Sequence, residues 1–359
     1  MSEVYLPVAS KSLIFDLDYG GLERRLEDWG EPKYRAKQIW QGLYQNLWVK
    51  PEQFSTLPKS LRQKLADAYH FSNLSPSQSL NSKDGETRKT LFDLPDGKAV
   101  EAVLMQYEKR RTLCISTQAG CAMGCVFCAT GQMGFLRNLS NGEIVEQVLY
   151  YSRILKEHGD QVTNIVIMGM GEPFHNYEAT MQAIDKLNEP QGYNFGARRI
   201  TVSTVGLVPA IQRFTAEHRQ VNLAISLHAA DDELRSSLLP VNKKYPLNDL
   251  MQACQEYIVL THRRLSFEWA LIQGVNDTPE QASKLAGLLK NFKRDDAILC
   301  HVNVIPLNPT TKYPGQATTR QRALDFKTRL NDHGIPCTIR IRRGIDIQAG
   351  CGQLAAQTK

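Results

Sequence analysis

The sequence predicts an α/β protein: a partial (β/α)6 barrel with a small N-terminal helical accessory domain and a C-terminal tail. Short β-rich runs alternate with amphipathic helical stretches from residue 112 onward, which is typical of a parallel sheet. The chain has 359 residues, enough to bury one large core and a smaller accessory domain. We expect helices over 1–75, a linker and β-hairpin extension over 76–111, the barrel over 112–343 and the tail over 344–359.

The N-terminal region shows helical spacing in two stretches. In "EPKYRAKQIWQGLYQNLW" apolar side chains recur every three or four residues, and Pro32 suits a first helical turn. In "STLPKSLRQKLADAYHF" every fourth residue from Leu57 to Tyr69 is apolar. The opposite face carries Lys59, Arg62 and Lys64. This pattern leaves two roles open, a stabilising cap and a nucleic-acid docking module.

The next region changes to turn-forming residues between short strands. "KDGE" (83–86) and "PDGK" (95–98) predict hairpin turns that lead into the barrel. Seven β-rich runs then follow, at 112–117, 163–168, 199–204, 221–227, 265–272, 299–305 and 336–341. In barrels of this class the chemistry lies at the C-terminal ends of the strands, so we expect the motifs that follow these runs to meet there.

Composition favours a protein of the cytoplasm. No apolar run reaches the roughly 18 residues of a membrane span, and the acidic start of the sequence does not resemble a secretory signal. Eight cysteines in such a protein are expected to stay reduced. The net charge of +6 is modest, but several arginine and lysine clusters, such as "RIRRG" (340–344), are compatible with an RNA partner.

Three cysteines stand close together in "CISTQAGCAMGCVFCATGQMGF". Cys121, Cys125 and Cys128 have the spacing C-x3-C-x2-C, and Phe127 precedes the last of them. A structural zinc ion needs four protein ligands, whereas a 4Fe–4S cluster held by three thiolates leaves one iron free for a small molecule. The spacing therefore indicates a 4Fe–4S cluster of the kind found in radical S-adenosylmethionine (SAM) enzymes.

The remaining signals are individually weak. "GMGEP" (169–173) ends a predicted strand, and its glycines allow close approach of a ligand to the backbone. Cys114 is typical of a small apolar residue buried in a strand. Cys351 lies between two glycines near the C-terminus, so it is either a tail residue without a role or a mobile and accessible thiol. Cys254, Cys300 and Cys337 are expected to pack as small core residues.

Taken together the motifs resemble those of the radical SAM RNA methyltransferases of the RlmN/Cfr family. The resemblance rests on the cysteine stretch with "GMGEP", "VSTVG", "AISLHA", "PLNP" and "IDIQAGCGQLA", and it extends from about residue 20 to the end. The likeness is greatest to the dual-specificity branch that methylates carbon 2 of adenine in 23S rRNA and tRNA.

The resemblance implies roles for particular residues. Cys121, Cys125 and Cys128 would hold the cluster. Cys351, on a catalytic tail, would carry the methyl group, Cys114 would resolve the intermediate through a disulfide bond, and Glu101 would accept a proton. The expected SAM contacts are Gly171, Glu172, Ser203, Ser226, Leu227, His228 and Asn308.

The resemblance also implies cofactors and partners. One 4Fe–4S cluster per chain and two SAM molecules per methylation are expected, with a target adenosine in 23S rRNA and in tRNA anticodon loops. That base should be unstacked from a loop to reach a deep pocket. A flavodoxin or ferredoxin would donate electrons, a thiol reductant would reopen the disulfide, and we expect a monomer with no membrane partner.

Three alternatives remain open from the sequence. The Cfr branch shares these motifs but modifies carbon 8 of adenine. A radical SAM enzyme acting on a small molecule or peptide would not need Cys351. A zinc-stabilised RNA-binding protein without catalysis would contain zinc and no sulfide.

Overall fold

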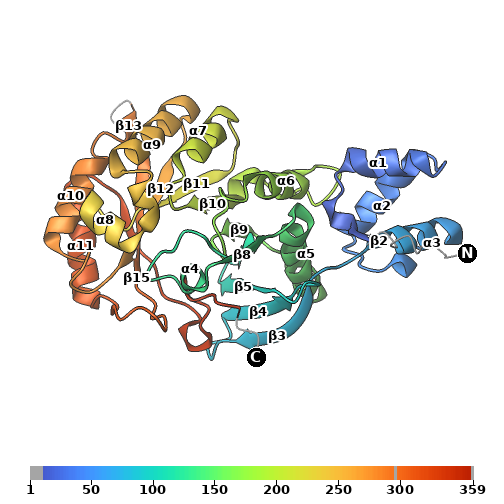
Figure 1. Ribbon diagram of the computed structural model, residues 1–359, viewed down its shortest axis with the longest axis horizontal. Helices are drawn as coiled ribbons and strands as arrows, with labels where there is room; N and C mark the ends of the chain where they lie inside the picture. Colours follow the sequence, from blue (N-terminus) through green and yellow to red (C-terminus); the bar gives the residue numbers. More distant parts are fainter. Residues whose placement is uncertain (1–10, 295–296, 357–359) are drawn as a thin grey trace, which may run out of the picture.

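A ten-stranded mixed sheet runs through the centre of the computed structural model, which describes residues 11–294 and 297–356 (Figure 1). Its strand order is β16-β15-β12-β11-β10-β9-β6-β5-β4-β3. Seven of its strands run parallel to one another. They are β6 (Arg110–Cys114), β9 (Asn164–Ile167), β10 (Ile200–Thr204), β11 (Asn222–Ser226), β12 (Leu265–Leu271), β15 (Cys300–Pro306) and β16 (Cys337–Ile339). Each overlaps one of the seven predicted runs, and the open order confirms a partial barrel.

Helices connect these strands, as the alternating pattern predicts. They are α5 (Asn141–Glu157), α6 (Tyr177–Asn188), α7 (Val208–Ala216), α8 (Asp232–Leu238), α9 (Leu247–Thr261), α10 (Pro279–Leu289) and α11 (Arg320–Asp332). The short antiparallel pair β13 (Lys293–Arg294) and β14 (Ala297–Ile298) precedes β15. The strand interiors are buried under these helices, so the sheet and helices share one large apolar core.

The hairpins predicted at "KDGE" and "PDGK" extend the same sheet. Strands β3 (Ser75–Asn81), β4 (Thr87–Asp93) and β5 (Ala99–Tyr107) are antiparallel, and β5 pairs with β6. Gly85 and Gly97 have φ of 71° and 74°, the left-handed backbone that such turns require. Residues 75–107 are therefore continuous with the barrel sheet through hydrogen bonds.

The N-terminal helices form a separate layer at one end of the molecule (Figure 1). They are α1 (Tyr19–Asp28), α2 (Tyr34–Tyr44) and α3 (Lys59–Ala68), and β1 (Ser12–Leu13) pairs with β2 (Tyr69–His70) beneath them. The two helices read from spacing are confirmed, whereas α1 was not predicted. The layer is fixed to the barrel by Asp16, whose Oδ1 accepts the Gly142 amide at 2.9 Å, and by Lys186, whose Nζ donates to the Phe15 carbonyl at 2.6 Å. Residues 1–10, part of the expected helical region, lie outside the described residues.

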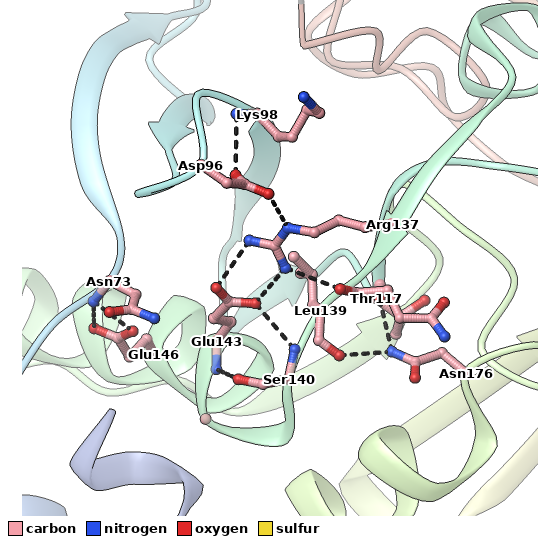
Figure 2. A network of polar contacts seen from close by, with 12 residues as sticks. Asn73, Asp96, Lys98, Thr117, Arg137, Leu139, Ser140, Glu143, Glu146 and Asn176 are labelled. Carbon is pink, nitrogen blue, oxygen red and sulfur yellow. Dashed lines mark hydrogen bonds and ion pairs between the residues drawn. The ribbon is translucent and has the colours of Figure 1, made fainter. Parts of the chain in front are cut away.

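A polar network holds the start of α5 against the hairpins (Figure 2). The Arg137 guanidinium lies between Asp96, at 2.6 Å, and the buried carboxylate of Glu143, at 2.8 and 3.0 Å. Glu143 and Ser140 form a reciprocal capping box at the first turn of α5. The loop that precedes α5 is therefore fixed at its C-terminal end. No helix within the described ranges is both long and apolar enough to cross a membrane.

Candidate active site

A cavity opens where the C-terminal ends of the parallel strands converge. Its wall receives residues from the ends of β6, β9, β10, β11, β12 and β15, from Arg340 just after β16, and from the tail at 349–354. The motifs that follow the predicted strands thus meet at one place, as expected. A small apolar cluster that includes Phe127, Val205 and Leu307 packs around the cysteine loop and limits its contact with water.

The cysteine loop lies between β6 and α5. Its stem is the short pair β7 (Gln118–Gly120) and β8 (Phe135–Asn138), and α4 (Ala129–Met133) begins directly after Cys128. The amide of buried Asn176 donates to the carbonyls of Thr117 and Leu139, at 2.9 and 2.8 Å, and so ties the two ends of the loop together (Figure 2).

The three clustered thiols all line the cavity. Burial raises the pKa of Cys121 to about 12, and burial together with Cys128 and Cys121 raises the pKa of Cys125 well above its usual value. The Cys121 and Cys125 thiols therefore hold their protons until a metal replaces them. As placed in the described residues, no group of three or more His, Cys, Asp or Glu side chains could hold a metal ion, the three thiols included. By their chemistry the three thiols are nevertheless the donor set of an iron–sulfur cluster, since a structural zinc ion needs four protein ligands.

The "GMGEP" strand end closes tightly on the cysteine loop. Gly171 has φ of 102°, and a Cβ on it would lie 2.6 Å from the Cβ of Gln118, so only glycine fits. The two oxygens of buried Glu172 accept the amides of Phe174 (3.0 Å) and Val205 (2.9 Å). Burial raises the Glu172 pKa to about 7. Glu172 therefore fixes the ends of β9 and β10 relative to each other, besides lining the cavity.

The ends of β10 and β11 present two hydroxyls and an imidazole. The Ser203 and Ser226 hydroxyls lie 3.2 Å apart. His228 has left-handed backbone (φ 61°), and its Nδ1 accepts the Ala270 amide at 2.9 Å. Burial, with a smaller effect from Arg235, lowers the His228 pKa to about 3, so the ring is neutral. Its ring meets Phe127 edge to face, with centroids 5.0 Å apart.

Leu227 is the expected contact whose side chain does not reach the cavity wall. Its side chain is fully buried, its amide donates to the Glu268 carbonyl at 3.0 Å, and its own carbonyl accepts from Arg235. The fully buried Arg235 also donates to the Val205 carbonyl at 2.6 Å. Arg235 thus links the ends of β10 and β11.

The tail folds over the cavity and is held on several sides. The Gly352 carbonyl accepts the Ala129 amide at 2.7 Å, and the Leu354 carbonyl accepts the Thr130 hydroxyl at 2.6 Å. Asn308 Nδ2 donates to the Cys351 carbonyl at 3.0 Å, whereas Asn308 Oδ1 is buried without a partner in the described residues. Residues 357–359 of the expected tail lie outside the described residues.

Cys351 and Cys114 line the same cavity. Cys351 is exposed as a residue, but desolvation of its sulfur at the cavity, and then proximity to Cys128 and Glu268, raise the Cys351 pKa to about 11. Burial and then proximity to Cys351 raise the Cys114 pKa to about 12. Both cysteines are free thiols, so the disulfide bond expected between them is not supported in this state of the protein. The buried Cys254, Cys300 and Cys337 are core residues, as predicted.

Glu101 lies beside the cavity rather than in its wall. Its Oε1 forms an ion pair with Lys89 at 2.8 Å, and its Oε2 accepts the Ala355 amide at 2.9 Å. Lys89 also donates to the Gln348 carbonyl at 3.2 Å. This buried ion pair therefore holds the tail by hydrogen bonds at Gln348 and at Ala355, on both sides of Cys351. The sequence did not reveal this role.

Two further residues of the wall were not predicted. Glu268 on β12 is buried, and Arg340 after β16 lies 3.9 Å from it. The signals in the sequence were a glutamate inside the mostly apolar run "LSFEWALI" and the basic cluster "RIRRG", whose Arg340 lines the cavity.

Comparison with known proteins agrees with this geometry. Residues 115–286 match the radical SAM superfamily, and residues 13–70 match the ribosomal RNA large subunit methyltransferase N-terminal domain. The chain is 51% identical to a probable dual-specificity RNA methyltransferase RlmN of Chloroflexus aurantiacus, over 96% of this chain and 93% of the relative. It is 46% identical to the dual-specificity RNA methyltransferase RlmN 1 of Myxococcus xanthus, over 98% and 96%.

A solved structure is similar over the same extent. The crystal structure of a radical SAM methyltransferase from Sphaerobacter thermophilus is 50% identical, with a TM-score of 0.93, and the match covers 96% of this chain and 100% of that one. The strand ends, the cysteine loop and the near-complete matches lead to one conclusion: the chain belongs to the RlmN family of radical SAM RNA methyltransferases.

Proposed function

We propose that this enzyme methylates carbon 2 of an unstacked adenine in 23S rRNA and in tRNA anticodon loops, using Cys351 as the methyl carrier. The observation that carries the proposal is the meeting of Cys351, Cys114 and the three clustered cysteines in one cavity. The names of its relatives as dual-specificity RNA methyltransferases support the two RNA substrates.

Cys121, Cys125 and Cys128 would hold one 4Fe–4S cluster. When bound, the cluster would supply the one-electron chemistry by which a second SAM removes a hydrogen atom from the Cys351 S-methyl group. SAM would contact Gly171, Glu172, Ser203, Ser226, Leu227, His228 and Asn308, with Leu227 contributing its backbone alone. The unpartnered Oδ1 of Asn308 supports this assignment, because a buried acceptor without a donor is costly.

Cys351 is needed because carbon 2 of adenine is electron-poor and cannot attack the sulfonium methyl group. A thiolate can, so the Cys351 sulfur would displace the methyl group from a first SAM. Burial holds this thiol protonated, while the positive charge of Arg340 lowers its pKa and favours the thiolate. Arg340 therefore supports formation of the nucleophile.

Product release would use the second thiol. The methylene carbon on Cys351 would bond to carbon 2, Glu101 would accept the ring proton, and the odd electron left on the ring would return to the one-electron carrier. In the docked tail Glu101 Oε2 accepts the Ala355 amide, so this contact must open for proton transfer. The Cys114 thiolate would then attack the Cys351 sulfur and break its bond to the methylene carbon, which leaves with the electron pair and takes a proton to become the methyl group. The methylated base leaves, and a thiol reductant reopens the transient disulfide.

The proposed function also implies an electron donor, a location, an oligomeric state and a surface that contacts RNA. A flavodoxin or ferredoxin would supply electrons in the cytoplasm, and the enzyme would work as a monomer. The basic face of α3, with Lys59, Arg62 and Lys64, would contact the RNA backbone.

Anaerobic assays with labelled SAM and bulk RNA from a strain lacking the activity test the proposal. Cys114→Ala should accumulate a covalent protein–RNA adduct, Cys351→Ala should give neither adduct nor product, and the core variant Cys254→Ala should behave as wild type. Nucleoside mass spectrometry should show 2-methyladenosine. Detection of 8-methyladenosine alone would show that carbon 8, and not carbon 2, is the target. Product formation by Cys351→Ala would favour an enzyme that acts on a small molecule or peptide. Zinc without sulfide in the purified protein would indicate the RNA-binding alternative.

A further inference from the structure

Glu268 is a buried carboxylate of the cavity wall with one oxygen satisfied and one unsatisfied. The residue is 4% exposed. Oε1 accepts the Asn303 amide at 2.9 Å and lies 3.9 Å from Arg340 Nη2. Oε2 is buried and finds no hydrogen-bond partner anywhere in 11–294 or 297–356. An unmet buried acceptor of this kind is costly, so the site is built for a donor that arrives with a ligand.

The position of Glu268 relates this acceptor to the methyl carrier. Glu268 pairs in register with Ser226 on β11 and with Asn303 on β15, so it lies between the proposed SAM strand ends and the tail. Glu268 and Arg340 are both close enough to Cys351 to affect its thiol. Burial raises the Glu268 pKa overall, and the smaller effects of Arg340 and Asn303, which favour the ionised form, offset that rise only in part.

The ligand that must approach Cys351 is the target base. Adenine presents one exocyclic N–H donor group, the 6-amino group, and flipped bases are read through hydrogen bonds at this edge. We infer that Glu268 Oε2 accepts a hydrogen bond from the 6-amino group of the target adenine, which makes Glu268 a specificity-determining residue. This inference rests on the proposed function, and it identifies the group that recognises the substrate.

The hydrogen bond from Asn303 makes the consequence of substitution specific. In Glu268→Gln the amide oxygen keeps the Asn303 bond, which places the amide nitrogen where Oε2 stands. That nitrogen is a donor: it opposes the amino group of adenine and matches the 6-carbonyl of inosine. Inosine retains a hydrogen on carbon 2, so it remains a possible acceptor of the methyl group.

The experiment uses the reconstituted holoenzyme and three RNA stem-loops that carry adenosine, purine riboside or inosine at the target position. Wild type should use adenosine about 10- to 150-fold better than purine riboside in kcat/KM, the range expected for one hydrogen bond to a charged group. The purine ring without its amino group is no less electron-poor, so ring reactivity does not explain this loss. Inosine should be used least, because its carbonyl faces the carboxylate.

Glu268→Gln should reduce the adenosine-to-inosine ratio at least tenfold and shift it toward inosine. Glu146→Gln is the matched control: it changes another buried carboxylate, which lies on α5 away from the cavity wall, and it should leave this ratio unchanged. SAM affinity, cluster content and thermal unfolding are measured for each variant.

Three results separate the outcomes. If wild type uses purine riboside as well as adenosine, the inference is overturned even without a folded variant. If Glu268→Gln keeps the wild-type ratio but loses affinity for SAM, Glu268 binds SAM instead and the inference is again overturned. If wild type modifies none of these RNAs or native RNA, the proposed function itself fails.

Discussion

Replacing Lys89 with methionine should release the tail that carries Cys351. The Lys89 ammonium contacts Glu101 at 2.8 Å and the Gln348 carbonyl at 3.2 Å, and both members of the ion pair are buried. Methionine keeps most of the volume but leaves the Glu101 carboxylate without its cation. Breaking a buried pair in this way costs about 3–5 kcal/mol. The tail can relieve part of that cost by detaching, because detachment exposes the carboxylate to water.

The size of the effect follows from the Cys351 thiol. Cys351 is an exposed residue even in the docked tail, but desolvation of its sulfur raises its pKa to about 11, so release of the tail should increase the thiolate fraction at neutral pH. A docking equilibrium weakened by about 3 kcal/mol also shifts about 100-fold toward the open form. Alkylation of Cys351 in Lys89→Met should therefore accelerate by about tenfold to 100-fold.

The assay is alkylation of the holoenzyme with iodoacetamide at pH 7.5, followed by quantification of the Cys351 peptide. Buried Cys254 and Cys300 serve as internal controls and should stay unmodified. Lys98→Met is the control variant, since in the described structure its side chain has no hydrogen bond or ion pair with the tail. An alkylation rate of Cys351 equal to that of wild type would refute the reasoning.

Three further predictions concern the loop, the core and the SAM site. Asn176→Ala leaves two carbonyls of the cysteine loop without donors, so urea unfolding should show a loss of about 2–6 kcal/mol, with less bound iron; unchanged stability would contradict this. Burial raises the Glu146 pKa from 4.5 to about 7, so folding favours the protonated carboxyl group. The stability that this preference gives is full below about pH 4.5 and is lost as the pH rises through 7. Glu146→Gln should therefore gain about 3 kcal/mol relative to wild type between pH 4.5 and 7.5, and a constant difference would be evidence against it. Gly171→Ala should weaken SAM binding at least tenfold in equilibrium dialysis, whereas Gly159→Ala, with similar strain but open space around it, should not.

The strand pattern was predictable because the parallel strands are short runs rich in apolar and β-branched residues that alternate with helical stretches. In "VNLAISL", for example, only Asn222 and Ser226 are polar. Helix α1 was missed because "YGGLERRLED" has two glycines in its first turn and buries only Leu22 and Leu26. Its stability comes from packing against α2, which a local pattern does not contain.

The site was predictable where a motif is continuous in sequence. The cysteine triplet and "GMGEP" are short continuous stretches, so the spacing of their residues alone indicates that these residues lie together. Glu268 and Arg340 are far apart in the sequence, and the pairing of β12 with β15 and of β15 with β16 brings them together. The attachment of the tail to Lys89 and Glu101 likewise depends on a hydrogen bond between residues 89 and 348, which are more than 250 positions apart in the sequence. No local spacing encodes such contacts.

The double attachment of the tail has an evolutionary consequence. Gln348 and Ala355 are fastened to neighbouring strands of one hairpin, and Cys351 lies within the arc between these fixed points. Adding or deleting a single residue in that arc would turn the sulfur away from the cavity, even with every side chain preserved. Selection should therefore tolerate exchanges of residue type here far more readily than changes in length.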